Sequence, residues 1–224
     1  MQRFDAGTIE LPLQTIDEPA TGWWIVALAE RLAAGLVLGA LSPLLLGIAL
    51  IIAWLSRESP LIAHRRVGFR GRPLWIFKLR TMWDGGGRTG LQLVEYLPPD
   101  DSGPPTEKTA SDPRVTSAFA ALCRRYSVDE IPQLWQVFRG EMSLVGPRPL
   151  TSYELTTYYG SDAYQLLAFR PGLSGLWQIT GRSRLTYSQR RRLDLFMIRK
   201  WSVRLYLLIL MTTVPKVVQG KDAW

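Results

Sequence analysis

Two adjacent carboxylates, Asp129 and Glu130, follow the arginine pair Arg124 and Arg125 in the sequence. An ionised carboxylate can serve as a nucleophile or as an oxygen ligand for Mg²⁺, and cations beside a helix N-terminus attract phosphate groups. Apolar residues continue from this point at helical spacing: Ile131, Leu134, Trp135, Val137 and Phe138. The segment therefore predicts a helix whose first turn carries the two acids, beside cations that could hold a phosphorylated substrate.

A purely structural explanation fits the same residues. Ser127 and Glu130 have the spacing of a capping box, and acids in a first turn complement the helix dipole. Taken alone, the capping box is the simpler interpretation of the acidic pair. The arginines directly upstream favour phosphate chemistry, so the sequence leaves both interpretations open.

Basic residues recur in three other motifs. Lys78 and Arg80 are two apart in a run that alternates like a strand (LWIFKLR), so both project from one face and could meet one phosphate. Arg148 lies between two prolines, whose fixed φ angles reduce the cost of orienting its guanidinium. Arg182 follows a glycine at the end of the strand-like run 172–180. A solvated strand face or a rigid surface turn would explain each motif without a ligand.

The composition indicates a folded and basic protein. With 47% hydrophobic residues the chain is too apolar for a disordered tail, and 27 Lys and Arg against 19 Asp and Glu give a net charge of +8. Cys123 and His64 are the single Cys and His, which excludes a disulfide framework and a Cys/His zinc site, so any metal must have oxygen ligands. The basic residues gather in 57–82 and 170–204, which predicts binding to nucleic acid, phosphorylated metabolites or anionic lipid.

A long apolar segment follows the acidic residues 1–22. Residues 32–55 form an uncharged run of 24, long enough at about 1.5 Å per residue to cross a hydrocarbon core of about 30 Å. Pro43, preceded by Ser42, removes a backbone donor at the centre, so the helix should kink or break there. A kinked helix that crosses the bilayer and a helix that returns to the same leaflet are both compatible with this pattern. Residues 23–56 are predicted to lie in a membrane, with the basic flank that follows in the cytosol.

The rest of the chain, 57–224, is predicted to be one cytosolic domain. Residues 84–111 are rich in Gly, Pro and acids and form a loop insertion, in which 91–97 could add a short strand. Residues 185–218 are predicted to be interfacial helices, because the apolar part, 205–214, is too short to span a bilayer and is flanked by cations. The N-terminus has no pattern of a cleaved secretory signal, which also favours a cytosolic catalytic part.

Five motifs, taken in order, resemble the bacterial sugar transferase family. They are KLRTM from residue 78, DPRVT from 112, RRYSVDEIPQLWQVFRGEMSLVGPRP from 124, RPGLSGLWQITGR from 170 and LDLFMIRKWS from 193. The resemblance extends roughly from Pro43 to the C-terminus, and the long central motif is highly specific. Members of this family are monotopic phosphoglycosyl transferases of the bacterial inner membrane, which start glycan assembly on undecaprenyl phosphate.

The resemblance implies an activity, a cofactor and site residues. The enzyme would take a phosphosugar from a nucleotide diphosphate sugar, expected to be a UDP-sugar, and pass it to polyprenyl phosphate with release of UMP, as the first membrane step of exopolysaccharide or other glycan assembly. Asp129 matches the nucleophile that forms a covalent acyl phosphate, Glu130 matches its partner, and both are expected to hold Mg²⁺. The resemblance assigns substrate or phosphate binding to a further set of residues: Lys78, Arg80, Arg124, Arg148, Arg182 and Asp194.

The implied fold is α+β and mainly helical. Ser42 and Pro43 match the helix-breaking pair of the family, so residues 23–56 would form a re-entrant membrane helix, broken at that pair, with both ends cytosolic. A small cytosolic catalytic domain with short strands and interfacial amphipathic helices would follow. The chain looks like a minimal catalytic form, and the small-residue face of its membrane segment leaves room for a homodimer.

Three positions depart from the family pattern. Ala120 stands near a usual glycine, Tyr206 stands where an acid often follows the Trp-Ser pair, and His64 stands where a Gln is common. Because residue 206 is a tyrosine, the resemblance does not support a functional role for an acid at this position.

Two other functions fit the sequence less well. A membrane-anchored basic adaptor that binds anionic lipid has no need for an Asp-Glu pair between arginine motifs. A nucleic-acid-binding protein is not expected, because the aromatic residues fall in apolar runs and no recognised binding motif occurs.

Overall fold

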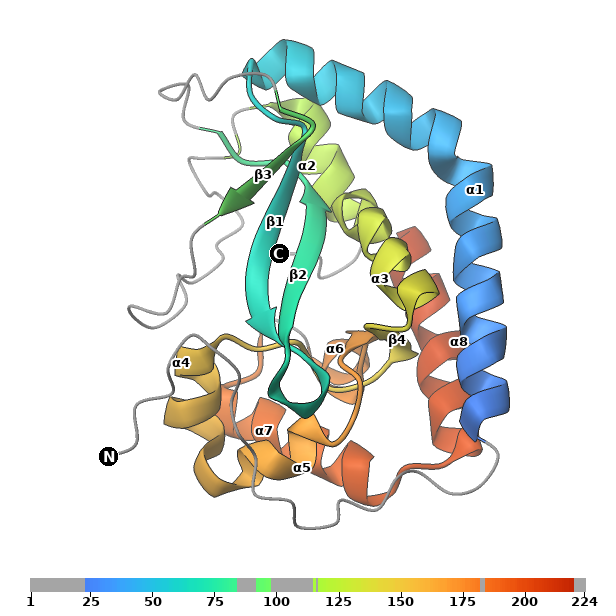
Figure 1. Ribbon diagram of the computed structural model, residues 1–224, viewed down its shortest axis with the longest axis vertical. Coiled ribbons are helices and arrows are strands. Elements are labelled where there is room, and N and C mark those ends of the chain that lie inside the picture. The colour runs from blue at the N-terminus through green and yellow to red at the C-terminus, as the bar shows by residue number, and fades with distance from the viewer. Residues whose placement is uncertain (1–22, 84–91, 98–114, 116, 182–183, 220–224) are drawn as a thin grey trace.

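The computed structural model describes residues 23–83, 92–97, 115, 117–181 and 184–219. Over these residues the protein is mainly helical with a three-stranded and a two-stranded sheet, which agrees with the α+β class. The long helix α1 forms one side of the molecule, and the strands lie on its inner side (Figure 1). The predicted extension 1–22, most of the loop 84–111, and Arg182 lie outside the described residues.

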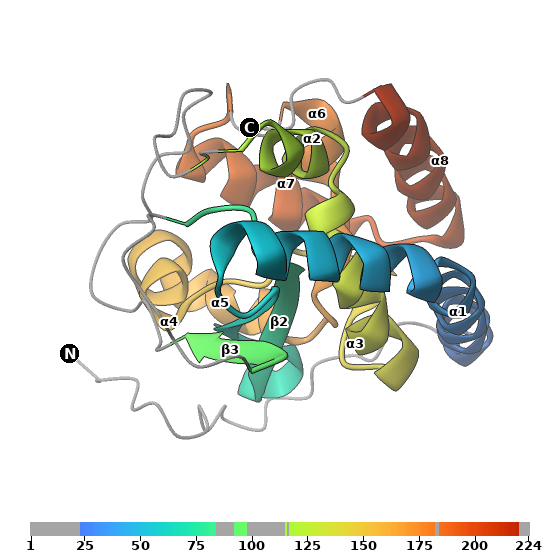
Figure 2. The same cartoon turned by 90° about the horizontal axis from the view of Figure 1, so that it is seen from above.

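Helix α1 comprises Trp23–Ser56 and is continuous through Ser42 and Pro43. Its ribbon bends near the middle, as two views show (Figures 1 and 2). Pro43 cannot donate to the carbonyl of Gly39, and the Ser42 hydroxyl donates to that oxygen instead, at 2.8 Å. The break expected at this pair is therefore wrong in detail: the helix bends and continues, because the carbonyl orphaned by proline has a substitute donor.

Most of the apolar surface of α1 is exposed. Among the described residues it is the one helix long and apolar enough to cross a membrane, and only 11% of its most apolar window, of mean hydropathy 2.6, is buried. Trp24 and Trp54, near its two ends, are 68% and 79% exposed. A contiguous apolar surface of this length is not stable in water, so α1 indicates membrane association.

The larger sheet has the strand order β2-β1-β3. Strand β1 (Leu61–Val67) pairs antiparallel with β2 (Pro73–Leu79) across the turn Phe69–Gly71, and parallel with β3 (Val94–Leu97). The strands predicted after residue 73 and within 91–97 are thus confirmed. In β2, Leu74 and Ile76 are buried on the face that also carries Lys78, so that this lysine is directed toward the helical core.

The acidic pair lies in the segment between the two sheets. This segment contains α2 (Ala118–Arg125), the 3-10 turn η2 (Val128–Gln133), α3 (Leu134–Arg139) and β4 (Ser143–Val145). Turn η2 packs against β2 and α3 packs against α1, which places the acids between the sheet and the membrane helix. Strand β4 then pairs parallel with β5 (Gly172–Ser174). Gly172 is required there, because a Cβ on it would lie 2.0 Å from the backbone nitrogen of Gly146.

The strand expected over 172–180 ends at Ser174. Gly175 has extended backbone angles (φ −155°, ψ 171°) and begins helix α6 (Leu176–Thr180), which contacts α7 and α8. Trp177 is buried in this helix at 5% exposure. The strand-like pattern was misleading because packing against neighbouring helices outweighs the local β preference of these residues.

The remaining elements form the helical part of the molecule. They are α4 (Ser152–Glu154), the π-turn η3 (Leu155–Tyr159), η4 (Gly160–Asp162), α5 (Ala163–Leu167), α7 (Tyr187–Arg199) and α8 (Val203–Gln219). The helices predicted over 185–218 correspond to α7 and α8. Helix α8 buries Tyr206 and Ile209 in a cluster with Trp23 of α1, while Leu208 and Met211 are 58% and 71% exposed. Helix α8 is therefore apolar on its exposed side as well as on its buried side, which is unusual for a helix with one face in water.

Candidate active site

Asp129 and Glu130 lie in η2, which connects α2 with α3 (Figure 1). Ser127, directly before this turn, has a left-handed backbone with a φ of 53°, and its side chain makes no capping hydrogen bond. The capping box considered as the structural alternative is therefore wrong. A non-glycine residue in this region costs about 1–3 kcal/mol, and such strain is concentrated at functional sites. The strained turn presents the two acids side by side.

Lys78 holds Glu130. Its Nζ donates to Oε1 of Glu130 at 2.6 Å, and the two side chains are 23% and 34% exposed. A pair this accessible to water contributes only about 0–1 kcal/mol to stability. Its chemical consequence is larger, because a cation beside the acidic pair reduces the repulsion that an approaching phosphate would meet.

Helix α2 brings Cys123 and Arg124 toward the same acids. Burial raises the pKa of the Cys123 thiol, and the nearby carboxylate of Asp129 raises it further, so Asp129 lies close to the end of α2. The Nε of Arg124 is buried and has no hydrogen-bond partner in the part of the chain that the structure describes. A buried donor without a partner is costly, so Arg124 is suited to meet an anion there.

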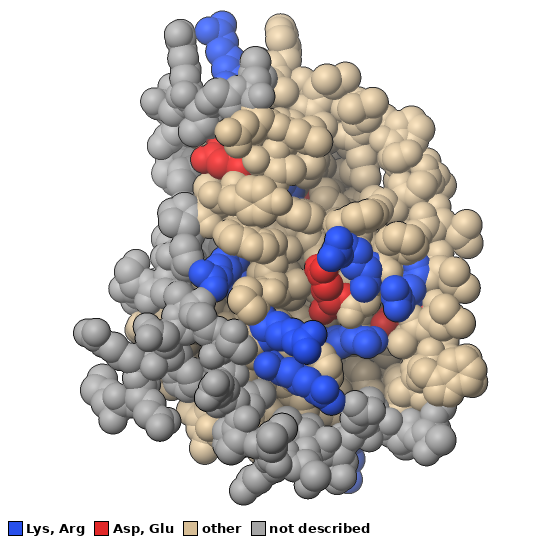
Figure 3. All heavy atoms as spheres, viewed as in Figure 1, with Lys and Arg blue, Asp and Glu red and all other residues tan. Residues whose placement is uncertain are grey.

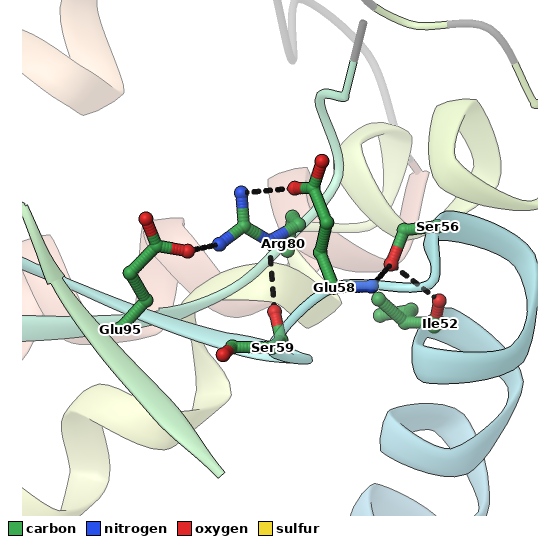
Figure 4. A network of polar contacts seen from close by, with 6 residues as sticks. All are labelled: Ile52, Ser56, Glu58, Ser59, Arg80 and Glu95. Atoms are coloured by element: carbon green, nitrogen blue, oxygen red, sulfur yellow. Dashed lines mark hydrogen bonds and ion pairs between the residues drawn. The ribbon is translucent and has the colours of Figure 1, made fainter. Parts of the chain in front are cut away.

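Arg80 lies in a different ionic network (Figure 4). Its Nη1 is 2.7 Å from Oε2 of Glu58, its Nη2 contacts Glu95, and its Nε donates to the carbonyl of Ser59 at 2.8 Å. Arg80 is 8% exposed and Glu58 5%. Glu58 follows α1 and Glu95 belongs to β3, so Arg80 joins the end of the membrane helix to the sheet. Lys78 and Arg80 thus have separate partners, and the charge of Arg80 already faces two carboxylates.

The acidic pair fits the oxygen chemistry of Mg²⁺. This ion is commonly bound by one or two carboxylates together with substrate phosphates and water. Asp129 and Glu130 supply two adjacent carboxylates. Within the described ranges there is no group of three or more His, Cys, Asp or Glu side chains that could hold a metal alone. Substrate phosphate oxygens and water would complete the coordination of an ion held by this pair.

Arg148 and Asp194 meet in a second cluster. The guanidinium carbon of Arg148 lies 5.3 Å from the ring centroid of Trp177. Asp194 is 1% exposed, and its Oδ2 accepts a hydrogen bond from the hydroxyl of Tyr159 at 2.8 Å. Burial raises the pKa of the Asp194 carboxyl to about 7, although the Tyr159 hydrogen bond and the charges of Arg148 and Arg190 oppose the rise. The predicted phosphate-binding and acidic residues that the structure describes thus fall into two clusters, one at η2 and one at α6 and α7, with Arg80 in neither.

Arg190 belongs to the second cluster and was not predicted from the sequence. Its guanidinium carbon lies 5.1 Å from the ring centroid of Trp177 and 5.0 Å from that of Tyr187. The sequence contains a pattern that indicates Arg190. Tyr187, Arg190 and Asp194 have the i, i+3, i+7 spacing of residues on one helix face.

Glu30 in α1 forms a buried junction that sequence reasoning also missed. Its Oε2 accepts hydrogen bonds from the Ser143 hydroxyl at 2.8 Å, the Leu144 N–H at 3.1 Å and the Tyr206 hydroxyl at 2.8 Å. Burial raises the pKa of Tyr206, and the charge of Glu30 raises it further. The junction joins the membrane helix to β4 and α8. An acid in so apolar a helix is itself a signal, since it is costly without partners.

Other basic side chains gather on the face that carries the turn between β1 and β2 (Figure 3). Arg70 and Arg170 lie 4.9 Å and 6.0 Å from the ring centroid of Phe69 in this turn. These two arginines come from the two basic stretches of the sequence. The fold therefore brings one arginine from each stretch to the same aromatic ring.

The sequence was also compared with known proteins. The family described as bacterial sugar transferase matches residues 21–220, a range that contains both clusters and helix α1. The chain belongs to this family. It is therefore a transferase, and the motifs on which the resemblance was based all lie in the matched range.

Similar proteins act in polysaccharide synthesis. The exopolysaccharide production proteins ExoY of Sinorhizobium fredii and Rhizobium meliloti are each 38% identical to this sugar transferase, over 87% of its length and 86% of theirs. A UDP-galactose-lipid carrier transferase of Erwinia amylovora is 35% identical over 84% of this chain and 40% of its own. An undecaprenyl-phosphate galactose phosphotransferase of Salmonella typhimurium is 36% identical over 72% of this chain and 34% of its own.

Proposed function

We propose that this sugar transferase moves a phosphosugar from a nucleotide diphosphate sugar, with a UDP-sugar as the expected donor, to polyprenyl phosphate in the bacterial inner membrane. The observation that supports the proposal most is the strained turn at Ser127, which presents Asp129 and Glu130 together beside Lys78. The names of the relatives, which include UDP-galactose and undecaprenyl phosphate, support the donor and the acceptor.

Asp129 is the proposed nucleophile in the first step. One of its carboxylate oxygens attacks the phosphorus that bears the sugar, and the bond from this phosphorus to the bridging oxygen breaks. The nucleoside monophosphate leaves with that oxygen and its electron pair, and the phosphosugar stays on Asp129 as an acyl phosphate. An anion that attacks a diphosphate meets like charge, which Lys78 and Arg124 would offset at the phosphate oxygens. Mg²⁺ held by Asp129 and Glu130 would supply further charge stabilisation.

Polyprenyl phosphate takes the phosphosugar in the second step. A phosphate oxygen of the lipid attacks the same phosphorus, the carboxylate of Asp129 leaves, and the product is a polyprenyl diphosphate sugar. Because transfer is divided into two steps, the nucleotide and the bulky lipid need not occupy the site together.

In this proposal α1 enters and leaves the membrane on the cytosolic side. Glu30 near its start is bonded to β4 and α8, and Glu58 just after its end is bonded through Arg80 to the sheet. Both ends are therefore attached to one domain. A straight helix from Glu30 to Ser56 would rise about 39 Å at 1.5 Å per residue, more than the hydrocarbon core, and would separate these attachments by the bilayer. The bend at Ser42 and Pro43 supports the re-entrant path.

Intact-protein mass spectrometry tests the covalent step. The protein in nanodiscs is incubated with Mg²⁺ and a panel of UDP-sugars without lipid acceptor, beside Asp129→Asn. We expect a mass gain of one phosphosugar in the wild type and none in the variant. Glu141→Gln is a matched control, because it removes one carboxylate whose side chain is 38% exposed and pairs with Arg139 instead of Lys78.

Two outcomes would contradict the proposal in different ways. Release of nucleoside monophosphate only after polyprenyl phosphate is added, without any adduct, would mean direct transfer and would refute Asp129 as nucleophile. No transfer with any donor, while the protein still binds membranes, would favour the basic adaptor.

A further inference from the structure

One face of α7 carries a stack of aromatic and cationic groups. The guanidinium of Arg190 lies against the rings of both Tyr187 and Trp177, and the guanidinium of Arg148 lies against the same Trp177 ring. Tyr187 in turn stacks on Tyr158 of η3, with ring centroids 4.0 Å apart and an interplanar angle of 11°. Two cationic side chains therefore contact one indole ring.

Several polar atoms in this cluster are buried without a partner among the described residues. They are Nε of Arg190, Nε1 of Trp177 and Oδ1 of Asp194. Arg148 and Arg190 also form no ion pair with a carboxylate in the described part of the chain. A guanidinium that stacks through its flat face keeps its in-plane N–H donors for another group. Buried donors left in this state lose about 1–3 kcal/mol each, which a bound acceptor would recover.

Two carboxylates act on this cluster, Glu154 and Asp194, but neither forms an ion pair with Arg148 or Arg190 among the described residues. Glu154 accepts from the Thr151 N–H at 2.9 Å and from the Tyr187 hydroxyl at 3.3 Å, so its oxygens already have partners. Asp194 is deeply buried, and its raised pKa of about 7 leaves it partly protonated near neutral pH. Arg190 also lies in the first turn of α7, where the helix dipole disfavours a cation.

We propose that Arg148 and Arg190 form an anion-binding subsite over Trp177 that holds a phosphate group of a substrate, with Arg190 as a phosphate-binding residue of the enzyme. The choice of substrates rests on the proposed function, but the binding itself does not require transfer. The planar guanidinium of a single arginine can present two parallel N–H donors to a phosphate. This phosphate belongs either to the nucleotide or to the polyprenyl lipid.

Equilibrium binding to the protein in nanodiscs tests the subsite and separates the two sources. One arm titrates UMP and the other titrates geranyl phosphate, a short polyprenyl phosphate. We compare the wild type with Arg190→Gln, Arg190→Lys and the control Arg192→Gln, which removes the same charge from an exposed position of the same helix. Loss of a charge-assisted contact should weaken at least one of the two ligands about tenfold or more in Arg190→Gln. The control should stay within about twofold of the wild type.

The arm that weakens identifies the ligand. Weaker UMP binding assigns the subsite to the nucleotide, weaker geranyl phosphate binding assigns it to the lipid, and loss in both arms assigns it to phosphate in general. Unchanged binding of both ligands in Arg190→Gln would overturn the subsite. Equal weakening in Arg190→Gln and the control Arg192→Gln would also overturn it, because the effect would then reflect net charge or misfolding. Failure of the proposed transfer would show separately, as binding of both ligands without adduct formation.

Discussion

Tyr206→Phe should lower the stability of the protein by removing one donor from the buried carboxylate of Glu30. The ring stays in place, and only the hydroxyl that donates to Oε2 at 2.8 Å is lost. Tyr206 is 4% exposed and Glu30 6%, so water cannot easily replace this donor. Hydrogen bonds to charged groups contribute about 1.5–3 kcal/mol. We therefore expect a loss of about 2 kcal/mol, which for a chain of this size corresponds to a fall of about 4–8 °C in unfolding temperature.

A double-mutant cycle with Glu30→Gln assigns this loss to the pair. The tryptophan fluorescence of nanodisc-embedded protein is followed during heating at one fixed scan rate. In the Glu30→Gln background the acceptor is neutral, so Tyr206→Phe should cost about 1 kcal/mol or less, which leaves a coupling of about 1 kcal/mol. Tyr164→Phe serves as the control, because that residue is 42% exposed. If the two changes add within about 0.5 kcal/mol, the junction does not carry the stability assigned to it and the reasoning is refuted.

Three further predictions concern the two clusters. The wild type should lose stability as the pH rises from about 4 to 7, and Asp194→Asn should not. Burial raises the pKa of the Asp194 carboxyl from 3.8 to about 7, so in this range the unfolded chain releases a proton that the folded protein retains. The free energy of unfolding of the wild type should therefore fall by at most about 4 kcal/mol across the range. Melting curves across this range check it, and a wild type that gains stability relative to the variant would contradict it. Ser127→Gly should raise the unfolding temperature by a few degrees, because glycine adopts a φ of 53° without strain. A lower unfolding temperature would mean instead that the serine side chain stabilises the turn. Lys78→Met should slow adduct formation on the order of 100-fold, as measured by quenched-flow mass spectrometry. The unfolding temperature should change little, because the ion pair with Glu130 is accessible to water. An unchanged rate would mean that Lys78 has no role in the reaction.

Local pattern predicted several elements of this protein because their cause is local. Strand β2 follows from alternating apolar residues, and α1 follows from an uncharged run too long for a soluble helix. The run 172–180 was predicted less well, because the helix Leu176–Thr180 depends on packing against α7 and α8. The 3-10 turn with a left-handed Ser127 was also missed, since no periodicity in a sequence distinguishes a strained turn from a capped one.

Site residues divide in the same way. The sequence alone shows that Asp129 and Glu130 are adjacent, and its arginine motifs predict phosphate chemistry. The sequence does not indicate which residues the cations pair with. Lys78 and Arg80 are two residues apart, yet one contacts Glu130 and the other contacts Glu58 and Glu95. Spacing along a strand gives the face of a side chain, but the partner comes from whichever element packs on that face.

The sequence by itself determined the family, the membrane helix and the acidic pair, because each of these depends on residue type and order over a short distance. Only the tertiary structure decided that Glu30 joins the membrane helix to β4 and α8 and that Arg190 shares Trp177 with Arg148. These contacts unite residues up to 176 positions apart in the chain. Whether a buried charge finds donors, and whether a cation finds a carboxylate or a ring, is set by the packing of distant elements, which sequence spacing does not encode.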